Sequence, residues 1–310
     1  MDRILITPRS LTSSPSSDLD ALRTAGYELV FATAGQTPNE AELLALIPDC
    51  VGWLAGVEPV SDAVIAAANK LRVISRNGTG VDNIPQLATA ARNITITRAM
   101  AANATGVAEL ALGLILANRR HLIETALGVR QGEWPRLRGL EIEGSSVGVV
   151  GMGAIGRKVA TAMSAMGATV IAYDPMTPDM GDLPITYLTL DHLLTTSDII
   201  TLHCPMPQDG LPLINAKVLT TTKQGLLLVN TARANLVDQA ALLGALNDGR
   251  LSGYATDVFA QEPPLDQTLA RHPAVIATSH IGGLTDQSVA RATQIAVANL
   301  LEGLKGPAHA

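Results

Sequence analysis

A glycine-rich turn, Gly151-Met152-Gly153-Ala154-Ile155-Gly156, directly follows the strand-like run Ser146–Val150. The spacing is GxGxxG, and the residues that continue it favour a helix. In such a turn the first glycine allows a tight bend, the second lets the backbone approach a pyrophosphate, and the third lets the helix pack on the strand. The helix N-terminus also favours the phosphate charge. The motif predicts a dinucleotide site, and a glycine turn without a ligand is the alternative.

An acidic residue stands where a ribose contact needs one. The next strand-like run, Thr169–Tyr173, leads into Asp174, at about the 20-residue spacing that the ribose-binding acid of a dinucleotide site shows. A carboxylate there binds the ribose 2′-hydroxyl and repels a 2′-phosphate. We therefore predict NAD as the cofactor and not NADP, and strand, turn, helix and acid together strongly favour the dinucleotide interpretation.

Three further side chains with reactive groups follow three successive apolar runs in the second half of the chain. They are Arg233, Glu262 and His280. An arginine binds anions, a histidine transfers a proton near neutral pH, and a carboxylate can pair with either. Ligands of open α/β sheets bind outside the carboxyl ends of the strands, so we expect these side chains to face one crevice. A structural ion pair of Arg233 with Glu262, and a core histidine at position 280, are the alternatives.

Short β-branched runs alternate with longer Ala- and Leu-rich stretches, a pattern typical of βαβ units with parallel sheets. The runs form two families, which predicts two doubly wound α/β domains. The expected strands of the first family are Ile4–Thr7, Leu29–Ala32, Val51–Leu54, Val73–Ser75 and Ile94–Thr97. Those of the second family are Ser146–Val150, Val170–Tyr173, Ile199–His203, Leu226–Asn230, Gly253–Val258 and Val275–Thr278.

Three helices are expected from the apolar periodicity. Ser61 can cap a helix over Ser61–Asn69. A connecting helix is expected over Val107–Ala117, and a last helix over Asp286–Leu304. The chain has no low-complexity linker, so ordered helices are expected to join the domains.

The composition excludes several classes of protein. With 47% hydrophobic and 16% charged residues, the 310-residue chain can bury the cores of about two domains and is not disordered. The net charge of −6 and the low aromatic content predict no nucleic-acid partner. Cys50 and Cys204 are too few for a disulfide framework, and no residue spacing resembles a metal site.

The same residues predict no membrane partner. The N-terminus enters a strand-like run directly, without the pattern of a secretory leader. No apolar stretch is long enough to span a bilayer. We therefore expect a cytoplasmic location.

Five segments, in order along the chain, resemble the D-isomer-specific 2-hydroxyacid dehydrogenase family, and most closely its 3-phosphoglycerate dehydrogenase branch in a short form without a regulatory domain. The segments are residues 77–83, the glycine turn, 230–238, 257–264 and 277–283. The resemblance implies a Rossmann NAD-binding domain at 101–284, inserted into a flavodoxin-like substrate-binding domain at 1–100 and 285–310. It also implies hydride transfer between NAD and a small D-2-hydroxy acid or 2-keto acid, of the glyoxylate, hydroxypyruvate or phosphoglycerate kind.

The resemblance also implies roles for the three strand-end residues. Arg233 would hold the substrate carboxylate and polarise the adjacent keto oxygen. His280 would protonate that oxygen during reduction and accept the proton during oxidation. Glu262 would pair with His280, fix its tautomer and favour its charged form. The expected substrate-binding residues beside Arg233 are Arg76, Asn77, Gly78 and Thr79.

The remaining expected site residues contact the cofactor in relatives of this kind. His203 is interpreted as a residue beside the nicotinamide ribose and not as a second catalyst. The expected cofactor-binding residues are Thr79, Gly151, Gly153, Ala154, Ile155, Gly156, Asp174, His203, Cys204, Pro205, Thr231, Ala232, Arg233, Asp257, His280, Gly282 and Gly283.

The chain departs from the family pattern at a few positions. Ala234 replaces the usual glycine after the arginine, and Ser279 replaces the usual proline before the histidine. Arg76 matches a basic position that some phosphoglycerate dehydrogenases use for the substrate phosphate. The second loop expected to help, residues 54–58, has no basic residue and carries Glu58 instead. A dianionic phosphate is therefore poorly matched to this pattern.

The resemblance further implies a homodimer, with the helix at Val107 as a candidate interface. A non-catalytic NAD-sensing scaffold, like the transcriptional corepressors of the same fold, is the alternative function. Fold alone does not separate it from an enzyme. Oxidation of NADH by 2-keto acids would.

Overall fold

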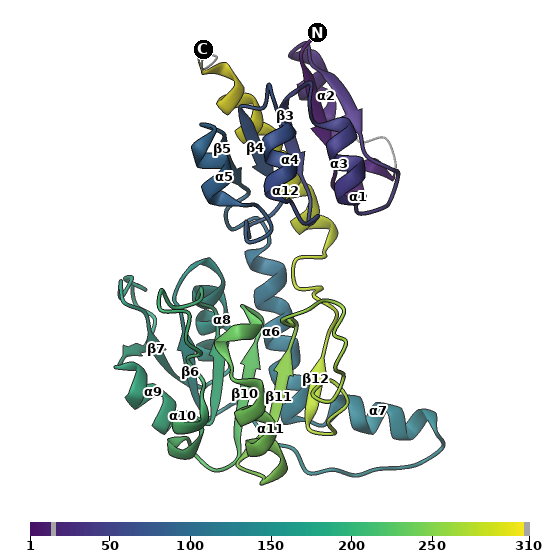
Figure 1. The fold of residues 1–310 in the computed structure, drawn as a ribbon. Coiled ribbons are helices and arrows are strands. Elements are labelled where there is room, and N and C mark those ends of the chain that lie inside the picture. The colour runs from purple at the N-terminus through teal and green to yellow at the C-terminus, as the bar shows by residue number, and fades with distance from the viewer. Residues whose placement is uncertain (14–16, 307–310) are drawn as a thin grey trace. The chain divides into compact units, whose positions relative to one another are not determined.

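The computed structural model describes residues 1–13 and 17–306. The chain forms two compact units (Figure 1). Unit 1 comprises Met1–Asn103 and Asp286–Ala310, and unit 2 comprises Ala104–Thr285. Unit 2 is thus inserted into the sequence of unit 1. The boundaries expected from the sequence, at 100/101 and 284/285, lie within three residues of those in the structure.

The sheet of unit 1 has five parallel strands in the order β2-β1-β3-β4-β5. This is the flavodoxin-like order, in which the chain first moves to one side of β1 and then returns to the other side. The carboxyl ends of β1 and β3 therefore flank the point where the strand order reverses. The strands are β1 (Arg3–Ile6), β2 (Glu28–Phe31), β3 (Cys50–Ala55), β4 (Val73–Arg76) and β5 (Thr95–Arg98).

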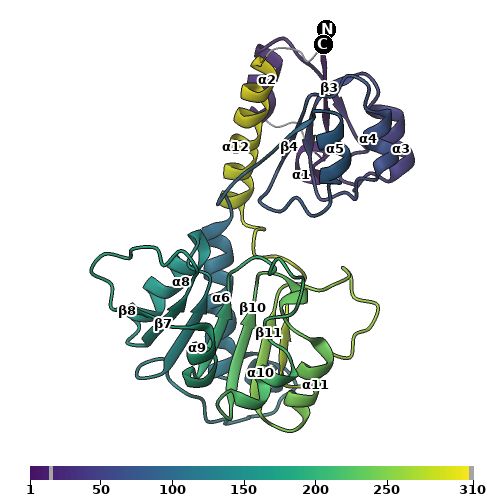
Figure 2. The ribbon, with the colours of Figure 1, turned by 60° about the vertical axis from the view of Figure 1, so that its left-hand side comes forward.

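Helices cover both faces of this sheet, because successive strand residues point to opposite sides. Leu5 packs into the apolar cluster with Trp53 and Val64, whereas Ile4 packs into the cluster with Leu300. Figure 2 shows α2 and α12 on one side of the sheet and α3 and α4 on the other. The helices are α1 (Arg9–Thr12), α2 (Asp20–Thr24), α3 (Glu40–Leu46), α4 (Asp62–Ala67), α5 (Gln86–Ala91) and α12 (Asp286–Lys305).

The sheet of unit 2 has seven parallel strands in the order β12-β11-β10-β9-β6-β7-β8. The order reverses between β6 and β9, as in a Rossmann fold with one added strand. The strands are β6 (Ser146–Val150), β7 (Thr169–Tyr173), β8 (Ile185–Tyr187), β9 (Ile199–Leu202), β10 (Leu226–Asn230), β11 (Leu251–Thr256) and β12 (Val275–Ala277). The predicted class, two doubly wound parallel-sheet domains, is confirmed.

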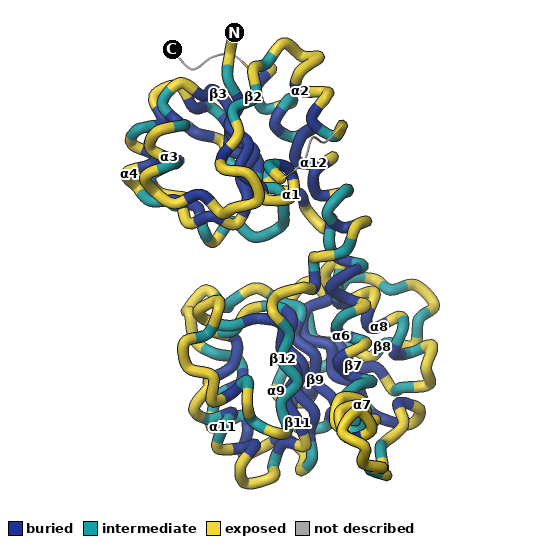
Figure 3. Tube along the Cα trace, turned by 90° about the vertical axis from the view of Figure 1, so that its right-hand side faces the viewer, coloured by how far each residue is buried: buried dark blue, intermediate teal, exposed yellow. Residues whose placement is uncertain are grey.

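Two layers of helices enclose the unit 2 sheet. Residues of α6 and α8 form one apolar cluster with the sheet, and residues of α9, α10 and α11 form the other. Figure 3 shows the buried strands inside each unit and the exposed residues on the outer turns. The helices are α6 (Ala104–Arg119), α7 (Leu122–Arg130), α8 (Ala154–Ala165), α9 (Leu190–Thr196), α10 (Ala216–Thr221) and α11 (Gln239–Asn247).

Several local predictions are confirmed and others are wrong. Ser61 caps α4, because its hydroxyl accepts the N–H of Val64 at 3.3 Å. β9 ends before His203, and β11 lies two residues before its predicted position. Strand β8 was not predicted, because its three residues are only half-buried or exposed and lack an apolar run.

Within residues 1–13 and 17–306, none of the helices combines the length and apolar character needed to cross a membrane.

Candidate active site

The glycine turn of unit 2 has the close approaches that its spacing predicts. Gly151 has φ of +93°, and a Cβ on it would lie 2.6 Å from the carbonyl oxygen of His203. A Cβ on Gly156 would lie 1.9 Å from the carbonyl oxygen of Gly151. A Cβ on Gly153 would instead meet nothing within 4 Å. Gly151 and Gly156 are thus required by the packing of the backbone. Gly153 instead leaves open space at the N-terminus of α8, where a pyrophosphate would bind.

Asp174 stands at the carboxyl end of β7 beside this turn. Its Oδ2 atom accepts the N–H of Met152 at 2.7 Å, and its Oδ1 atom accepts the N–H of Met176 at 2.8 Å. The carboxylate is therefore fixed by the backbone of the glycine turn and of its own loop. Each oxygen retains acceptor capacity, which suits hydroxyl donors such as those of a ribose.

His203 follows β9, on the other side of the point where the strand order reverses. Its Nε2 atom lies 2.9 Å from the hydroxyl of Thr201. Burial of the ring lowers the pKa of His203 to about 3. The ring is therefore neutral at physiological pH, which excludes it as a proton donor.

Two buried polar atoms at this edge of the sheet lack a hydrogen-bond partner among the residues that the structure describes. They are Nδ1 of His203 and Oγ1 of Thr231, which follow the adjacent strands β9 and β10. Buried polar atoms are normally paired. Both residues were predicted to contact the cofactor, so the unpaired atoms fit a bound polar ligand beside the glycine turn.

Cys204 lies next to His203 in the same loop. Burial raises the pKa of its thiol to about 11, so the thiol stays protonated and is a poor nucleophile near neutral pH. The backbone N–H of Cys204 would lie 2.9 Å from a Cβ on Gly151. This loop therefore packs closely on the glycine turn.

Arg233 is exposed in the loop after β10. The buried side chain of Asn230 shapes this loop: its Nδ2 atom donates to the carbonyl of Arg233 at 2.8 Å, and its Oδ1 atom accepts the N–H of Ala232 at 3.1 Å. The guanidinium donates from Nη1 to the carbonyl of Ala232 at 2.9 Å. Asn230 was not singled out in the sequence, since a strand-end asparagine gives no signal of such a role.

His280 and Glu262 form a hydrogen-bonded pair. Nδ1 of His280 lies 2.7 Å from Oε2 of Glu262, and Oε1 of Glu262 accepts the N–H of Phe259 at 3.0 Å. Both side chains are partly exposed. With Nδ1 facing the carboxylate, Nε2 is the imidazole atom that can exchange a proton with a substrate.

The backbone of His280 is held in an unusual conformation by Asp257. His280 has φ of +56°, a left-handed value that is rare outside glycine. The buried carboxylate of Asp257 accepts the N–H groups of Ile281 and Gly282, each at 2.8 Å, and the hydroxyl of Thr278 at 2.6 Å. Asp257 therefore anchors the loop on both sides of His280. The sequence predicts Asp257 as a cofactor contact, and the structure adds this positioning role.

The other predicted substrate-binding residues belong to unit 1. Arg76 ends β4, and its Nη1 atom donates to the carbonyl of Asn77 at 2.5 Å. The amide of Asn77 donates to Thr293 of α12 at 3.4 Å, and Thr79 donates to the carbonyl of Ala99 at 3.2 Å. A Cβ on Gly78 would lie 2.7 Å from Nη1 of Arg76. These four residues form a compact group of their own at the carboxyl edge of the unit 1 sheet.

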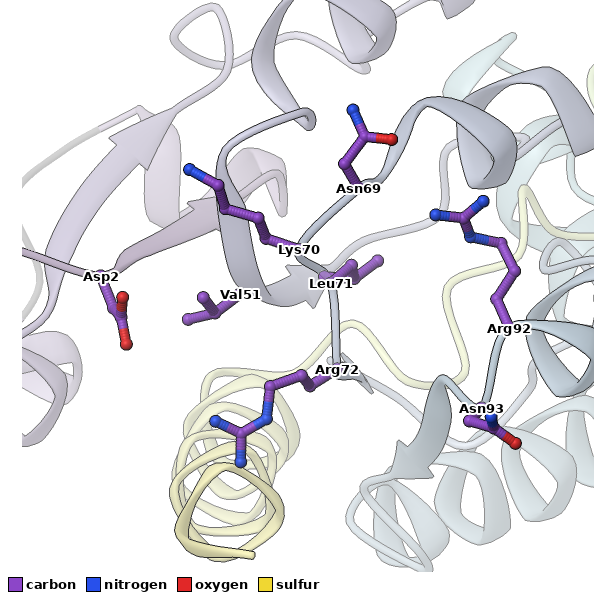
Figure 4. A pocket seen from close by; sticks show the side chains of 8 residues that line it. All are labelled: Asp2, Val51, Asn69, Lys70, Leu71, Arg72, Arg92 and Asn93. Carbon is purple, nitrogen blue, oxygen red and sulfur yellow. The ribbon is translucent and has the colours of Figure 1, made fainter. Parts of the chain in front are cut away.

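A hollow of about 450 Å³ lies at the opposite, amino-terminal edge of this sheet (Figure 4). It is lined by Lys70, Arg72 and Arg92 among others, but each cation is engaged with a neighbouring group. Lys70 pairs with Asp49 at 2.7 Å, Arg72 donates to the carbonyl of Leu304, and Arg92 donates to that of Ala68. The hollow thus lies at the edge of the unit 1 sheet opposite to the predicted substrate-binding residues.

Comparisons with known proteins decide the family. Residues 112–282 match the model of the D-isomer specific 2-hydroxyacid dehydrogenase NAD binding domain, which covers more than half of the chain. The chain belongs to this family. The predicted resemblance is thereby confirmed, and unit 2 is the NAD-binding domain of a D-2-hydroxyacid dehydrogenase family member.

Individual relatives agree. The chain is 39% identical to D-3-phosphoglycerate dehydrogenase of Mycobacterium tuberculosis over 82% of its own length and 49% of that protein. The TT0316 protein of Thermus thermophilus superposes with a TM-score of 0.88 at 35% identity, covering 98% of this chain and 97% of that one. D-lactate dehydrogenase of Aquifex aeolicus, complexed with NAD and lactic acid, gives 0.82 at 26% identity, covering 99% and 100%. The chain spans about half the length of the curated relatives it matches.

Proposed function

We propose that the chain transfers a hydride between NAD and a small D-2-hydroxy acid or 2-keto acid. The observation that carries the proposal is the 2.7 Å pair of His280 and Glu262, at the same edge of the unit 2 sheet as the glycine turn and Arg233. The family match to an NAD-binding domain supports the cofactor. Nicotinamide, when bound, supplies or accepts the hydride.

Arg233 is the proposed anchor for the substrate. A guanidinium holds a carboxylate with two parallel hydrogen bonds and so orients the adjacent carbonyl group. Its loop is held by the buried Asn230, which limits the positions that the guanidinium samples. A keto oxygen held there gains negative charge during reduction and needs a proton at that moment.

His280 is the proposed source of that proton. The imidazolium holds the proton at Nε2, because Nδ1 is engaged by Glu262, and releases it to the oxygen of the substrate. In oxidation the neutral ring accepts the hydroxyl proton at the same atom. Glu262 stabilises the charged ring and holds its plane, and Asp257 holds the backbone of its loop.

The test is a single assay. Oxidation of NADH is followed with glyoxylate, hydroxypyruvate, pyruvate and 3-phosphohydroxypyruvate as acceptors. The proposal expects turnover with at least one of these acids. Tight NADH binding without turnover of any of them would contradict the proposal and favour the NAD-sensing scaffold.

We also propose that the chain forms a homodimer through α7 and the segment that follows it. Apolar residues of α6, such as Val107, Ala111 and Ile115, are buried inside unit 2, so they are not available to a partner, and the interface expected at this helix stays a prediction. Large exposed apolar side chains gather instead at 122–140, and Figure 1 shows α7 projecting from the body of unit 2. They are Leu122, Ile123, Leu127, Val129, Trp134, Leu137 and Leu140.

Exposed apolar patches of this kind mark interaction surfaces. Sedimentation should give about twice the chain mass of 32.3 kDa, and Leu127→Glu should yield a monomer. Leu265→Glu, which changes an exposed leucine elsewhere in unit 2, should not. A monomeric wild-type protein would contradict the proposal.

The cytoplasmic location expected from the sequence also stays a prediction.

A further inference from the structure

The carboxyl edge of the unit 1 sheet has the geometry of a ligand site in its own right. The strand order reverses between β1 and β3, and ligands of doubly wound sheets bind outside the carboxyl ends at such a point. Thr7 follows β1, Gly56 and Glu58 follow β3, and Arg76 ends β4. Two charged side chains of opposite sign therefore stand at the place where unit 1 would bind part of a ligand.

Glu58 is a buried carboxylate, with only 1% of its surface exposed. Its Oε1 atom accepts the hydroxyl of Thr7 and the N–H of Gly56, the latter at 2.9 Å. Thr7 in turn accepts the indole N–H of Trp53 at 3.0 Å. A Cβ on Gly56 would lie 2.6 Å from Oε2 of Glu58, so this glycine leaves the room that the carboxylate occupies. The acid is therefore a fixed part of the fold.

Arg76 is a half-buried cation at this edge. Burial lowers the pKa of Arg76, and the negative charges of Glu58 and Asp82 oppose that shift. Both carboxylates thus lie within electrostatic range of the guanidinium. Its Nε atom is buried and has no hydrogen-bond partner in the part of the chain that the structure describes. The guanidinium can still donate hydrogen bonds, but its charge already lies within electrostatic range of a buried carboxylate.

Two other arginines lie near this edge, and they do not alter the balance of charge that Glu58 and Arg76 set there. Arg9 follows β1 at the start of α1, and Arg98 lies beside Arg76 in register on β5. Both are exposed, so water and salt screen their charges. Glu58 is buried and acts through a medium of low dielectric, where a charge has a much stronger effect. Residues 54–60 contain no basic side chain.

We propose that Glu58 is a specificity residue, which at the carboxyl edge of the unit 1 sheet disfavours a 2-keto acid that carries a phosphate and favours one that carries a small uncharged group. The hydroxyl of a hydroxymethyl group can accept a hydrogen bond from Arg76 without adding charge, and a hydrogen atom at the same place adds no charge either. A phosphate dianion has to approach a buried carboxylate whose position is fixed by Thr7 and Gly56. This proposal rests on the proposed dehydrogenase function and names its substrate class.

The test compares two acids that differ by one phosphoryl group, hydroxypyruvate and 3-phosphohydroxypyruvate, by kcat/KM for NADH oxidation. We expect the wild-type protein to prefer hydroxypyruvate by about 100-fold, since like charges brought together in a binding site are strongly unfavourable. Glu58→Gln keeps the side-chain volume and an acceptor for Thr7 while removing the charge. It should reduce the preference by about tenfold or more.

A matched control and a second measurement keep the outcomes separate. Asp62→Asn removes an exposed acid on α4 of the same unit and should leave the preference unchanged. If Glu58→Gln does not fold, the wild-type preference, together with inhibition by 3-phosphoglycerate weaker than that by glycerate, still decides the matter. Equal efficiency with both acids in the wild type would overturn the inference alone. If the protein turns over neither these two acids nor any other 2-keto acid, the proposed function is overturned, and this inference falls with it.

Discussion

Nδ1 of His280 lies 2.7 Å from Oε2 of Glu262, while the second carboxylate oxygen accepts the backbone N–H of Phe259. The glutamate is thus oriented by its own loop before it meets the histidine. It holds Nδ1 of the ring and leaves Nε2 directed away from the pair. The relationship links two strand ends, β11 and β12, that are adjacent in the sheet.

The first prediction follows from this pair. Reduction needs a proton at Nε2 of His280, and the carboxylate of Glu262 holds Nδ1 of the same ring. Glu262→Gln keeps a hydrogen-bonding group but removes the charge, so kcat for reduction should fall by roughly tenfold or more, while the dissociation constant for NADH stays close to the wild-type value. Glu124→Gln is the control, because it removes the carboxylate of the exposed pair with His121. An unchanged kcat in Glu262→Gln would show that the pair does not support the proton transfer.

The second prediction concerns the choice of cofactor. The wild-type protein should use NADH at least roughly 100-fold more efficiently than NADPH, because the carboxylate of Asp174 repels a 2′-phosphate. Asp174→Ala should narrow that ratio, and kcat/KM with both cofactors measures it. Asp179→Ala, which removes an exposed acid of the same loop, should leave the ratio of NADH to NADPH efficiency unchanged. Equal use of both cofactors by the wild type would refute the assignment of Asp174.

The third prediction separates the two functions of the glycine turn. Gly153→Ala adds a methyl group that meets no protein atom, so the protein should fold with its normal thermal stability but bind NADH more weakly. Gly156→Ala drives a Cβ into the carbonyl of Gly151 and should lower the stability itself. Thermal unfolding and fluorescence titration with NADH measure the two effects. Normal NADH binding by Gly153→Ala would place the pyrophosphate elsewhere.

The fourth prediction uses the buried histidine. Burial lowers the pKa of His203 from 6.5 to about 3, so between these values the unfolded chain binds a proton that the folded protein excludes. Stability should therefore fall as pH falls from about 6.5 towards 3, with this residue contributing up to about 1.4 kcal/mol per pH unit. Urea unfolding at several pH values measures the slope. His203→Gln should flatten this slope of the unfolding free energy against pH. His192→Gln, which changes an exposed histidine, should leave the slope unchanged. A wild-type slope in His203→Gln would show that other groups cause the loss of stability.

The sequence predicts most of the fold because the buried strands carry a clear pattern. The predicted limits of Ser146–Val150 and Leu226–Asn230 match β6 and β10, since apolar runs bounded by polar residues have unambiguous ends. Strand β8 and helix α7 were missed. Strand β8 is only three residues long. Helix α7 exposes apolar residues that do not pack into the core of unit 2, so its sequence lacks the pattern of one buried face.

The site is predictable to the extent that its chemistry lies in motifs. The glycine turn, Asp174 and the three strand-end residues stand in recognisable patterns. The support that Asp257 gives to the His280 loop is not visible, because it joins a strand end to a turn 24 residues away. The burial of Glu58 beside Arg76 is equally hidden, since it depends on the packing of three strand ends.

The most direct test of the central claim is turnover by His280→Ala. With NADH and the best 2-keto acid of the panel, kcat should fall by roughly 10²–10⁴-fold, the usual contribution of a positioned acid, while the dissociation constant for NADH stays close to the wild-type value. His121→Ala, which changes a surface histidine of the same unit, should keep full activity. Wild-type turnover by His280→Ala would contradict the account.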